Sequence, residues 1–335
     1  MRVVAAVDKF KGTASAAAVA QAIGHACWEL GHDCIEVALA DGGEGTLDAL
    51  GGPNRTSTVT GPLGDPVEAE WRFHRGTAVI EMARASGLTL VGGPAQNDPI
   101  AASTTGTGEL IDKALDLGAE RIIVCLGGSA TTDGGLGAVR AIHAPARLRG
   151  VEFLVACDVE TRFVDAARDF APQKGASPTQ VRLLESRLER LVQMYKETYG
   201  VDVSSIEGAG AAGGLAGGLL ALGANLIPGF DMVADEVGLH DHLRTADLVI
   251  TGEGQIDVTS FEGKVVGGVV DLARTTGVPV AAICGRIDPS AYDAPEFTRL
   301  DAGVVSLTET FGQERAMNEP LWCVERAALE LLRNR

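Results

Sequence analysis

Charged residues in this sequence lie in glycine-rich segments that each follow a short apolar run. Glycine lets backbone N–H groups approach an anion closely, and a helix that begins after such a segment adds positive potential. Carboxylates in the same segments are ligands that Mg²⁺ accepts. Five segments combine glycine with small and charged residues: DKFKG at 8–12, DGGEGT at 41–46, GGSATTDGG at 127–135, APQKGA at 171–176 and TGEGQID at 251–257.

Three lysines make a purely structural explanation of these segments incomplete. A carboxylate near the start of a helix can be a simple cap, but a lysine cannot cap a helix N-terminus. Lys11, Lys174 and Lys264 therefore favour binding of an anion. The acidic residues beside them indicate that the anion carries a metal ion.

Familiar phosphate-binding motifs do not explain the pattern. The Gly263-Lys264 pair is followed by valine, where a Walker A loop needs Ser or Thr. A GxGxxG match occurs at 208–213, with Asp231 at a tolerable distance, but the preceding VDVSSIE is a poor buried strand. Close helix packing explains this motif better than a dinucleotide fold, although a nicotinamide dehydrogenase stays an alternative.

The composition narrows the classes of partner. The net charge of -17 argues against nucleic acid and anionic membrane surfaces, and 4% aromatic residues argues against a stacking platform for single strands. The six cysteines form no CxxC pair and are expected to be reduced, which favours the cytoplasm. The N-terminal apolar run is too short for a signal peptide. The uncharged stretch 208–229 is expected to be a buried helix of a soluble protein, because its glycines would stabilise a membrane span poorly.

Alternation of strand-like and helix-like patterns predicts an α/β fold with two domains. Residues 1–61 and 240–335 are expected to form a doubly wound, Rossmann- or flavodoxin-like parallel sheet. Residues 62–239 are expected to form an inserted mixed α/β domain, with the active-site cleft between the two. The clearest helix is 177–199, because Ser177, Pro178 and Gln180 form a capping box. The expected strands are 2–7, 34–39, 58–60, 67–73, 78–82, 121–126, 153–157, 248–251, 280–284 and 304–307.

The ordered set of motifs resembles the bacterial type of glycerate kinase that phosphorylates the 2-hydroxyl. The similarity runs from residue 6 to about residue 285, in family order. The pieces that carry it are DKFKGTAS, ADGGEGT, VIEMARASGL, STTGTGELI, LGGSATTDGGLG, VACDV, PQKGA, GAGAAGGL and ADLVITGEGQID, followed by GK.

This resemblance implies ATP, a divalent metal (usually Mg²⁺) and D-glycerate, bound in a cleft between two α/β domains. Asp133 is then expected to accept the proton of the glycerate hydroxyl, with Asp158 as second candidate, and Lys11 to contact phosphate or carboxylate. The expected metal contacts are Asp41, Glu44, Glu253 and Asp257. The expected nucleotide and substrate contacts are Asp8, Gly42, Gly43, Gly45, Thr46, Gly127, Gly128, Ser129, Lys174, Gly252, Gly254 and Lys264.

Several departures from the family pattern concern the acceptor side. The chain is short at 138–154 and at 164–170, and ETRF at 160–163 replaces a common DNPL. Lys9 and Thr259 stand where Ser and Gln are common. A product of 3-phosphoglycerate, another small hydroxy-acid acceptor, or a non-catalytic metabolite sensor therefore stay as alternatives.

Overall fold

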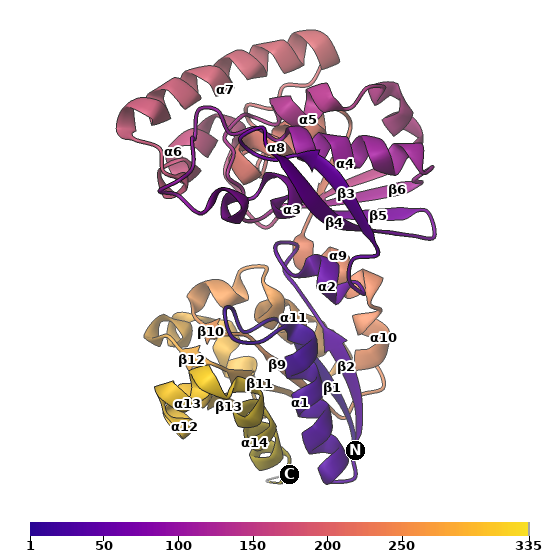
Figure 1. Cartoon of the computed structure of the whole chain (residues 1–335). Helices are drawn as coiled ribbons and strands as arrows, with labels where there is room; N and C mark the ends of the chain where they lie inside the picture. The colour runs from indigo at the N-terminus through magenta and orange to yellow at the C-terminus, as the bar shows by residue number, and fades with distance from the viewer. Residues whose placement is uncertain (334–335) are drawn as a thin grey trace. The chain divides into compact units, whose positions relative to one another are not determined.

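The computed structural model describes residues 1–333, which divide into two compact units. Unit 1 contains Met1–Asp41 and the segment that begins at Gly229, and unit 2 is Gly42–Pro228. In Figure 1 the indigo N-terminal segment of unit 1 lies beside its orange-to-yellow C-terminal segment. The α/β fold class is confirmed in both units.

Unit 1 is built on a parallel sheet of five strands in the order β13-β11-β9-β1-β2. A parallel sheet is covered on both faces, so its strands are apolar almost throughout, as RVVAAV in β1 illustrates. The strands are β1 (Arg2–Val7), β2 (Asp33–Ala38), β9 (Leu248–Gly252), β11 (Val280–Cys284) and β13 (Val304–Ser306), with a separate short pair, β10 (Gln255–Ile256) and β12 (Arg286–Ile287).

Helices pack on the two faces of this sheet. α1 and α14 contact each other and the strands β1 and β11, whereas α10 and α11 contact β1 from the other side. Val3, Ala5 and Val7 join the core with α1 and α14, and the alternating Val4 and Ala6 are buried as well. The helices of unit 1 are α1 (Ala16–Glu29), α9 (Gly229–Glu236), α10 (Leu239–Leu243), α11 (Val265–Thr276), α12 (Leu307–Phe311), α13 (Gln313–Asn318) and α14 (Pro320–Arg333).

Unit 2 contains a mixed sheet of six strands in the order β3-β4-β5-β6-β7-β8. An antiparallel meander, β3 to β5, leads into the parallel strands β5 to β8. The carboxyl ends of the parallel strands therefore meet at one edge, where ligand-binding loops usually lie. The strands are β3 (Arg55–Thr60), β4 (Pro66–His74), β5 (Thr77–Glu81), β6 (Arg121–Cys125), β7 (Glu152–Ala156) and β8 (Asn225–Ile227).

The longest helix of unit 2 has the ends that the sequence predicts. The Ser177 side chain and the Gln180 side chain cap each other's backbone, and Gly200 ends the helix with a φ of 76°. The helices of unit 2 are α2 (Thr46–Ala49), α3 (Ala83–Ser86), α4 (Thr105–Asp116), α5 (Leu136–Ala141), α6 (Ala166–Phe170), α7 (Pro178–Tyr199) and α8 (Ala211–Ala221).

The boundaries between the two units along the sequence differ from the predicted ones, which were 61/62 and 239/240. Residues 55–60 form β3 and pair with β4 along their whole length, so they belong to the mixed sheet. α9 begins the second segment of unit 1 at Gly229. The compact units are therefore separated at 41/42 and 228/229.

The helix expected across 208–229 was wrong at both ends: α8 begins at Ala211, and its backbone is not helical at 212–214. α8 ends at Ala221, and Gly223, with a φ of 93°, turns the chain into β8. Glycines of α8 pack against the segment that follows β6. A Cβ on Gly213 would overlap Thr131 O, and one on Gly135 would lie 3.0 Å from Gly218 Cα. Residues 201–210 form turns and coil, and the strand of this region follows the GxGxxG motif, so the motif serves close packing.

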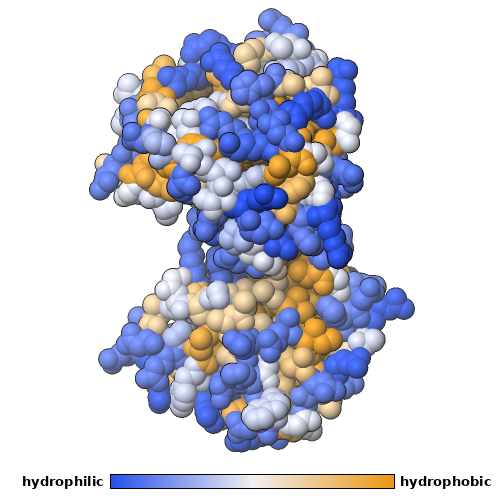
Figure 2. Space-filling model, turned by 45° about the vertical axis from the view of Figure 1, so that its right-hand side comes forward, coloured by the Kyte–Doolittle hydropathy of each residue, from blue (hydrophilic) through white to orange (hydrophobic). Residues whose placement is uncertain are grey.

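Hydrophilic residues cover most of the face of both units that Figure 2 shows, with hydrophobic residues in smaller separate areas. Within residues 1–333, none of the helices has both the length and the apolar character needed to cross a membrane.

Replacement of Gly213 by alanine tests the close packing between α8 and the segment after β6. Gly213 and Gly223 both have positive φ, but a methyl group meets Thr131 O only at Gly213. We expect Gly223→Ala to cost about 1 kcal/mol of stability from backbone strain and Gly213→Ala roughly 2 kcal/mol more from overpacking. Chemical denaturation measures both, and equal losses would contradict the packing argument.

Candidate functional site

Three loops of unit 1 meet at the carboxyl ends of β1, β9 and β11. A Cβ on Gly252 would overlap Ile283 O, and one on Gly285 would overlap Gly254 O. A Cβ on Gly254 would lie 3.1 Å from Lys11 N. Glycine is therefore required for the backbones to approach this closely. The structure brings the predicted segments 8–12 and 251–257 together.

One buried and one half-buried carboxylate lie at this junction. Asp8 is 8% exposed, and burial raises its pKa to about 6, against the opposing effect of Lys9; the Asp41 charge raises the pKa further. Burial also raises the pKa of Glu253 to about 7, a hydrogen bond from Ser260 lowers it, and the charge of Asp8 raises it. Such shifts are common where a protein holds charged groups ready for a ligand.

Glu253 also has an unsatisfied oxygen. Its Oε1 is buried without a hydrogen-bond partner in the described part of the chain, and the same holds for Thr251 Oγ1. A buried acceptor without a donor is costly unless a ligand completes it. The junction therefore has the character of a site for a cation.

The loop after β10 links Lys264 to Asp257 through Thr259. Lys264 Nζ donates to Thr259 Oγ1 at 2.6 Å, and Thr259 Oγ1 donates to Asp257 Oδ1 at 2.7 Å. Asp257 Oδ1 also accepts from Ser260 N, which caps the 3₁₀ turn 258–261. In the sequence, Thr259 stands out only because Gln is common at this position in the family. In the structure it links two predicted site residues, Asp257 and Lys264.

The remaining predicted residues of unit 1 lie on the same side of the sheet. Asp41 is close enough to Asp8 to affect its pKa. Lys11 is exposed in the turn that follows β1. Asp41 and Glu44, predicted together as metal contacts, belong to different units.

In unit 2, the segment 42–46 packs against the segment that follows β6. A Cβ on Gly127 would lie 3.2 Å from Gly43 Cα, and one on Gly128 would overlap the carboxylate of Glu44. Gly43 O accepts a hydrogen bond from Thr46 Oγ1 at 2.8 Å. The predicted binding residues of these two segments are therefore brought together.

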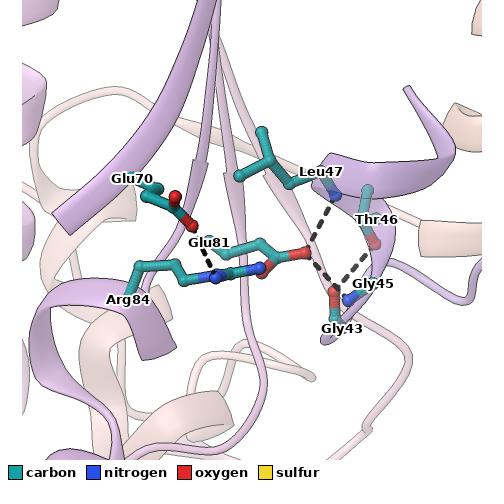
Figure 3. Close-up of polar contacts among 7 residues, drawn as sticks. All are labelled: Gly43, Gly45, Thr46, Leu47, Glu70, Glu81 and Arg84. Carbon is teal, nitrogen blue, oxygen red and sulfur yellow. Dashed lines mark hydrogen bonds and ion pairs between the residues drawn. The ribbon is translucent and has the colours of Figure 1, made fainter. Parts of the chain in front are cut away.

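Glu81, at the end of β5, contacts the same segment (Figure 3). Glu81 and Arg84 belong to the motif VIEMARASGL, from which the sequence predicted only that they brace the second domain. The position of this carboxylate at the carboxyl end of a predicted strand was a further signal in the sequence.

Asp133 is held by four donors, which changes its expected role. Its Oδ2 accepts from Thr104 N, Thr104 Oγ1 and Gly137 N at 2.8–3.1 Å, and its Oδ1 accepts from Gly135 N at 3.0 Å. An ionised carboxylate has about four lone-pair positions. This arrangement indicates that Asp133 organises the starts of α4 and α5 rather than accepting a proton from a substrate.

The side chain of Lys174 points into the interior of unit 2. It is 4% exposed, and its Nζ donates to Thr131 O at 2.6 Å and lies 3.5 Å from Ser129 Oγ. Burial lowers its pKa to about 7, against the opposing charge of Asp133. The geometry indicates that Lys174 braces the segment after β6 rather than holding a substrate carboxylate directly.

Asp158 is exposed two residues beyond the end of β7, at the edge of the sheet where the other loops of unit 2 lie. The part of the chain that the structure covers contains no group of three or more His, Cys, Asp or Glu side chains arranged to hold a metal.

Comparison with known proteins finds similarity to glycerate kinases. The model of the Glycerate kinase family matches residues 3–146 and 142–334. Glycerate 2-kinase of Escherichia coli K12 is 41% identical over 328 residues, covering 86% of each chain. Glycerate kinase of Halalkalibacterium halodurans is 40% identical over 330 residues, covering 87% of this chain and 86% of that protein.

A solved structure agrees with the fold described above. A protein of Salmonella typhimurium LT2, described as glycerate kinase 2, superposes with a TM-score of 0.84 at 36% identity, covering 100% of this chain and 99% of that one. With the family model matching along nearly the whole sequence, this chain belongs to the glycerate kinase family.

Proposed function

We propose that this chain catalyses the ATP-dependent phosphorylation of D-glycerate on its 2-hydroxyl group, giving 2-phosphoglycerate. The observation that carries the proposal is the 41% identity, over most of both chains, with a relative named glycerate 2-kinase. The glycine-rich segments of both units support it, since they offer backbone donors and cations of the kind that bind phosphate.

Phosphoryl transfer needs positioning and neutralisation of charge more than covalent work by the protein. We assign phosphate contacts to Lys11 and Lys264 and backbone donors to Gly42, Gly43, Gly127, Gly128, Gly252 and Gly254. Gly45, whose N–H already donates to Glu81 Oε1, is assigned to shaping the loop beside the nucleotide. Asp8, Thr46 and Ser129 complete the proposed binding residues.

Mg²⁺ fits the carboxylates of unit 1. The unsatisfied Oε1 of Glu253 and the buried carboxylate of Asp8 offer one or two protein ligands. Mg²⁺ ordinarily takes few protein carboxylates and completes its shell with waters and substrate phosphates. When bound, the ion would neutralise phosphate charge. Asp41, Glu44 and Asp257 stay proposed as water-mediated contacts.

Asp158 is the better candidate for accepting the proton of the glycerate hydroxyl. It is exposed at the carboxyl edge of the sheet, whereas the oxygens of Asp133 already accept four hydrogen bonds. The cytoplasm is the proposed location, which the six free cysteines support.

A coupled assay of ADP release tests the function. We expect turnover with D-glycerate in a panel of small hydroxy acids, and NMR of the product should identify 2-phosphoglycerate. Formation of 3-phosphoglycerate would select the alternative isomer. Binding of ATP without turnover of any acceptor would favour the metabolite sensor, and binding of a nicotinamide cofactor would favour the dehydrogenase.

Two asparagine variants separate the roles of the aspartates. Asp158→Asn is expected to lower kcat by about a hundredfold or more, because a positioned proton acceptor contributes about that much, with little change in Tm. Asp133→Asn is expected to lower Tm by several degrees, because it disrupts hydrogen bonds worth roughly 1–3 kcal/mol. A wild-type kcat in Asp158→Asn would remove it from the reaction. A large loss of kcat at unchanged Tm in Asp133→Asn would restore that residue as the acceptor.

Replacement of Glu253 by glutamine tests the half-buried carboxylate by its pH dependence. In the folded protein the pKa of Glu253 is about 7, above the ordinary 4.5. The contribution of its protonated carboxyl group to stability is therefore complete below pH 4.5 and is lost as the pH rises to about 7, because ionisation of the group then favours the unfolded chain. Glu253→Gln should therefore gain in Tm relative to wild type between pH 5 and pH 8. One pKa unit is about 1.4 kcal/mol, so the gain has a ceiling of roughly 3 kcal/mol.

The same variant tests the proposed metal contact. Added Mg²⁺ should raise the Tm of the chelator-treated wild type at pH 8 and leave that of Glu253→Gln unchanged. The exposed Glu262 provides a matched control, and Glu262→Gln should respond to Mg²⁺ like wild type. Equal Mg²⁺ responses in all three proteins would contradict the assignment.

A further inference from the structure

The start of α2 is capped by a carboxylate from another part of the chain. α2 begins after Gly45, which has no side chain with which to cap it and adopts a φ of 94°. The first N–H groups of a helix need acceptors from outside the helix. Glu81 Oε1 accepts from Gly45 N and Leu47 N, each at 2.9 Å (Figure 3). Glu81 is 36 residues from Gly45 in sequence, so β5 supplies the cap that the segment itself lacks.

The second oxygen of Glu81 is neutralised by a half-exposed arginine. Arg84 Nε donates to Glu81 Oε2 at 3.2 Å, and Arg84 Nη1 donates to Glu70 Oε2 at 2.9 Å. Glu81 is only 3% exposed, and a buried carboxylate without such partners would be strongly destabilising. The three side chains form a continuous chain of contacts from β4 to the start of α2 (Figure 3).

These contacts control how Glu44 is presented. Glu44 is exposed and lies between Gly43, whose carbonyl is bonded by Thr46, and Gly45, whose N–H is bonded by Glu81. Its carboxylate lies against Gly128, where a methyl group would overlap it. Without the Glu81 anchor, the backbone on the C-terminal side of Glu44 would lose its fixed orientation.

We infer that Glu81 is a positioning residue that fixes the backbone of 43–47, so that Glu44 is oriented for the nucleotide. The inference rests on the proposed function, in which this segment contacts ATP. Glu81 itself touches no reacting atom and acts through the segment.

Glu81→Ala tests the inference by two separate readouts. Hydrogen–deuterium exchange of the peptide that covers 43–50 should accelerate about tenfold or more, while β6 and α4 keep their protection. The KM for ATP should rise about tenfold or more, the effect expected from losing hydrogen bonds to a charged group. The KM for glycerate should change much less.

Two further variants grade the effect. Glu81→Gln keeps an oxygen that can accept both N–H groups, so it should restore most of the affinity for ATP. Glu109→Gln is the matched control, because Glu109 also accepts from a backbone N–H of unit 2, that of Thr60, and makes this contact away from 43–47. Its KM for ATP should equal that of wild type.

Either of two results would overturn the inference. One is wild-type exchange of 43–50 in Glu81→Ala, and the other is faster exchange with unchanged KM and kcat. If Glu81→Ala does not fold, Glu81→Asp replaces it, since a shorter carboxylate keeps the charge but withdraws from both N–H groups. Failure of the wild type to phosphorylate any acceptor would instead refute the proposed function, and the exchange measurement would still test the contact.

Discussion

Backbone segments at the strand ends approach each other with no side chain between them, and both groups of candidate site residues depend on this constraint. In unit 1, the last residue of β9, Gly252, touches the backbone of β11, and Gly254 in the segment after β9 touches the segment after β1. In unit 2, Gly127 lies against Gly43 and Gly213 against Thr131. These close approaches account for part of the high glycine content of the sequence, because a methyl group at these positions would separate two segments that carry charged side chains.

The two units accommodate buried carboxylates in opposite ways. In unit 1, Asp8 and Glu253 are raised in pKa by burial, and Glu253 keeps an oxygen with no donor from the described residues. In unit 2, Asp133 and Glu81 are surrounded by N–H and O–H donors from the loops around them. The first arrangement leaves carboxylates available to an external cation, and the second uses carboxylates to fix the shape of the loops.

Local sequence patterns were sufficient for most of the fold. The capping box at Ser177 and the apolar run of β1 depend on neighbouring residues, and both are found as expected. The roles of individual charged residues were not accessible in this way, because their partners are distant in sequence. Asp133 meets Thr104 across 29 residues, and Lys174 meets Thr131 across 43. The motifs indicate which residues gather at the strand ends, but only the fold shows which of them face inward.

The order of the segments along the chain has a consequence for folding during synthesis. β1 lies between β2 and β9 in its sheet, and Arg2 N bonds Asp247 Oδ2 across 245 residues. β1 precedes unit 2 in the chain and β9 follows it, so all of unit 2 must be synthesised before β1 can pair with β9. A parallel pairing this distant in sequence forms late and carries a large loop-closure entropy. Until β9 emerges, one edge of this apolar strand is open to pairing with other chains.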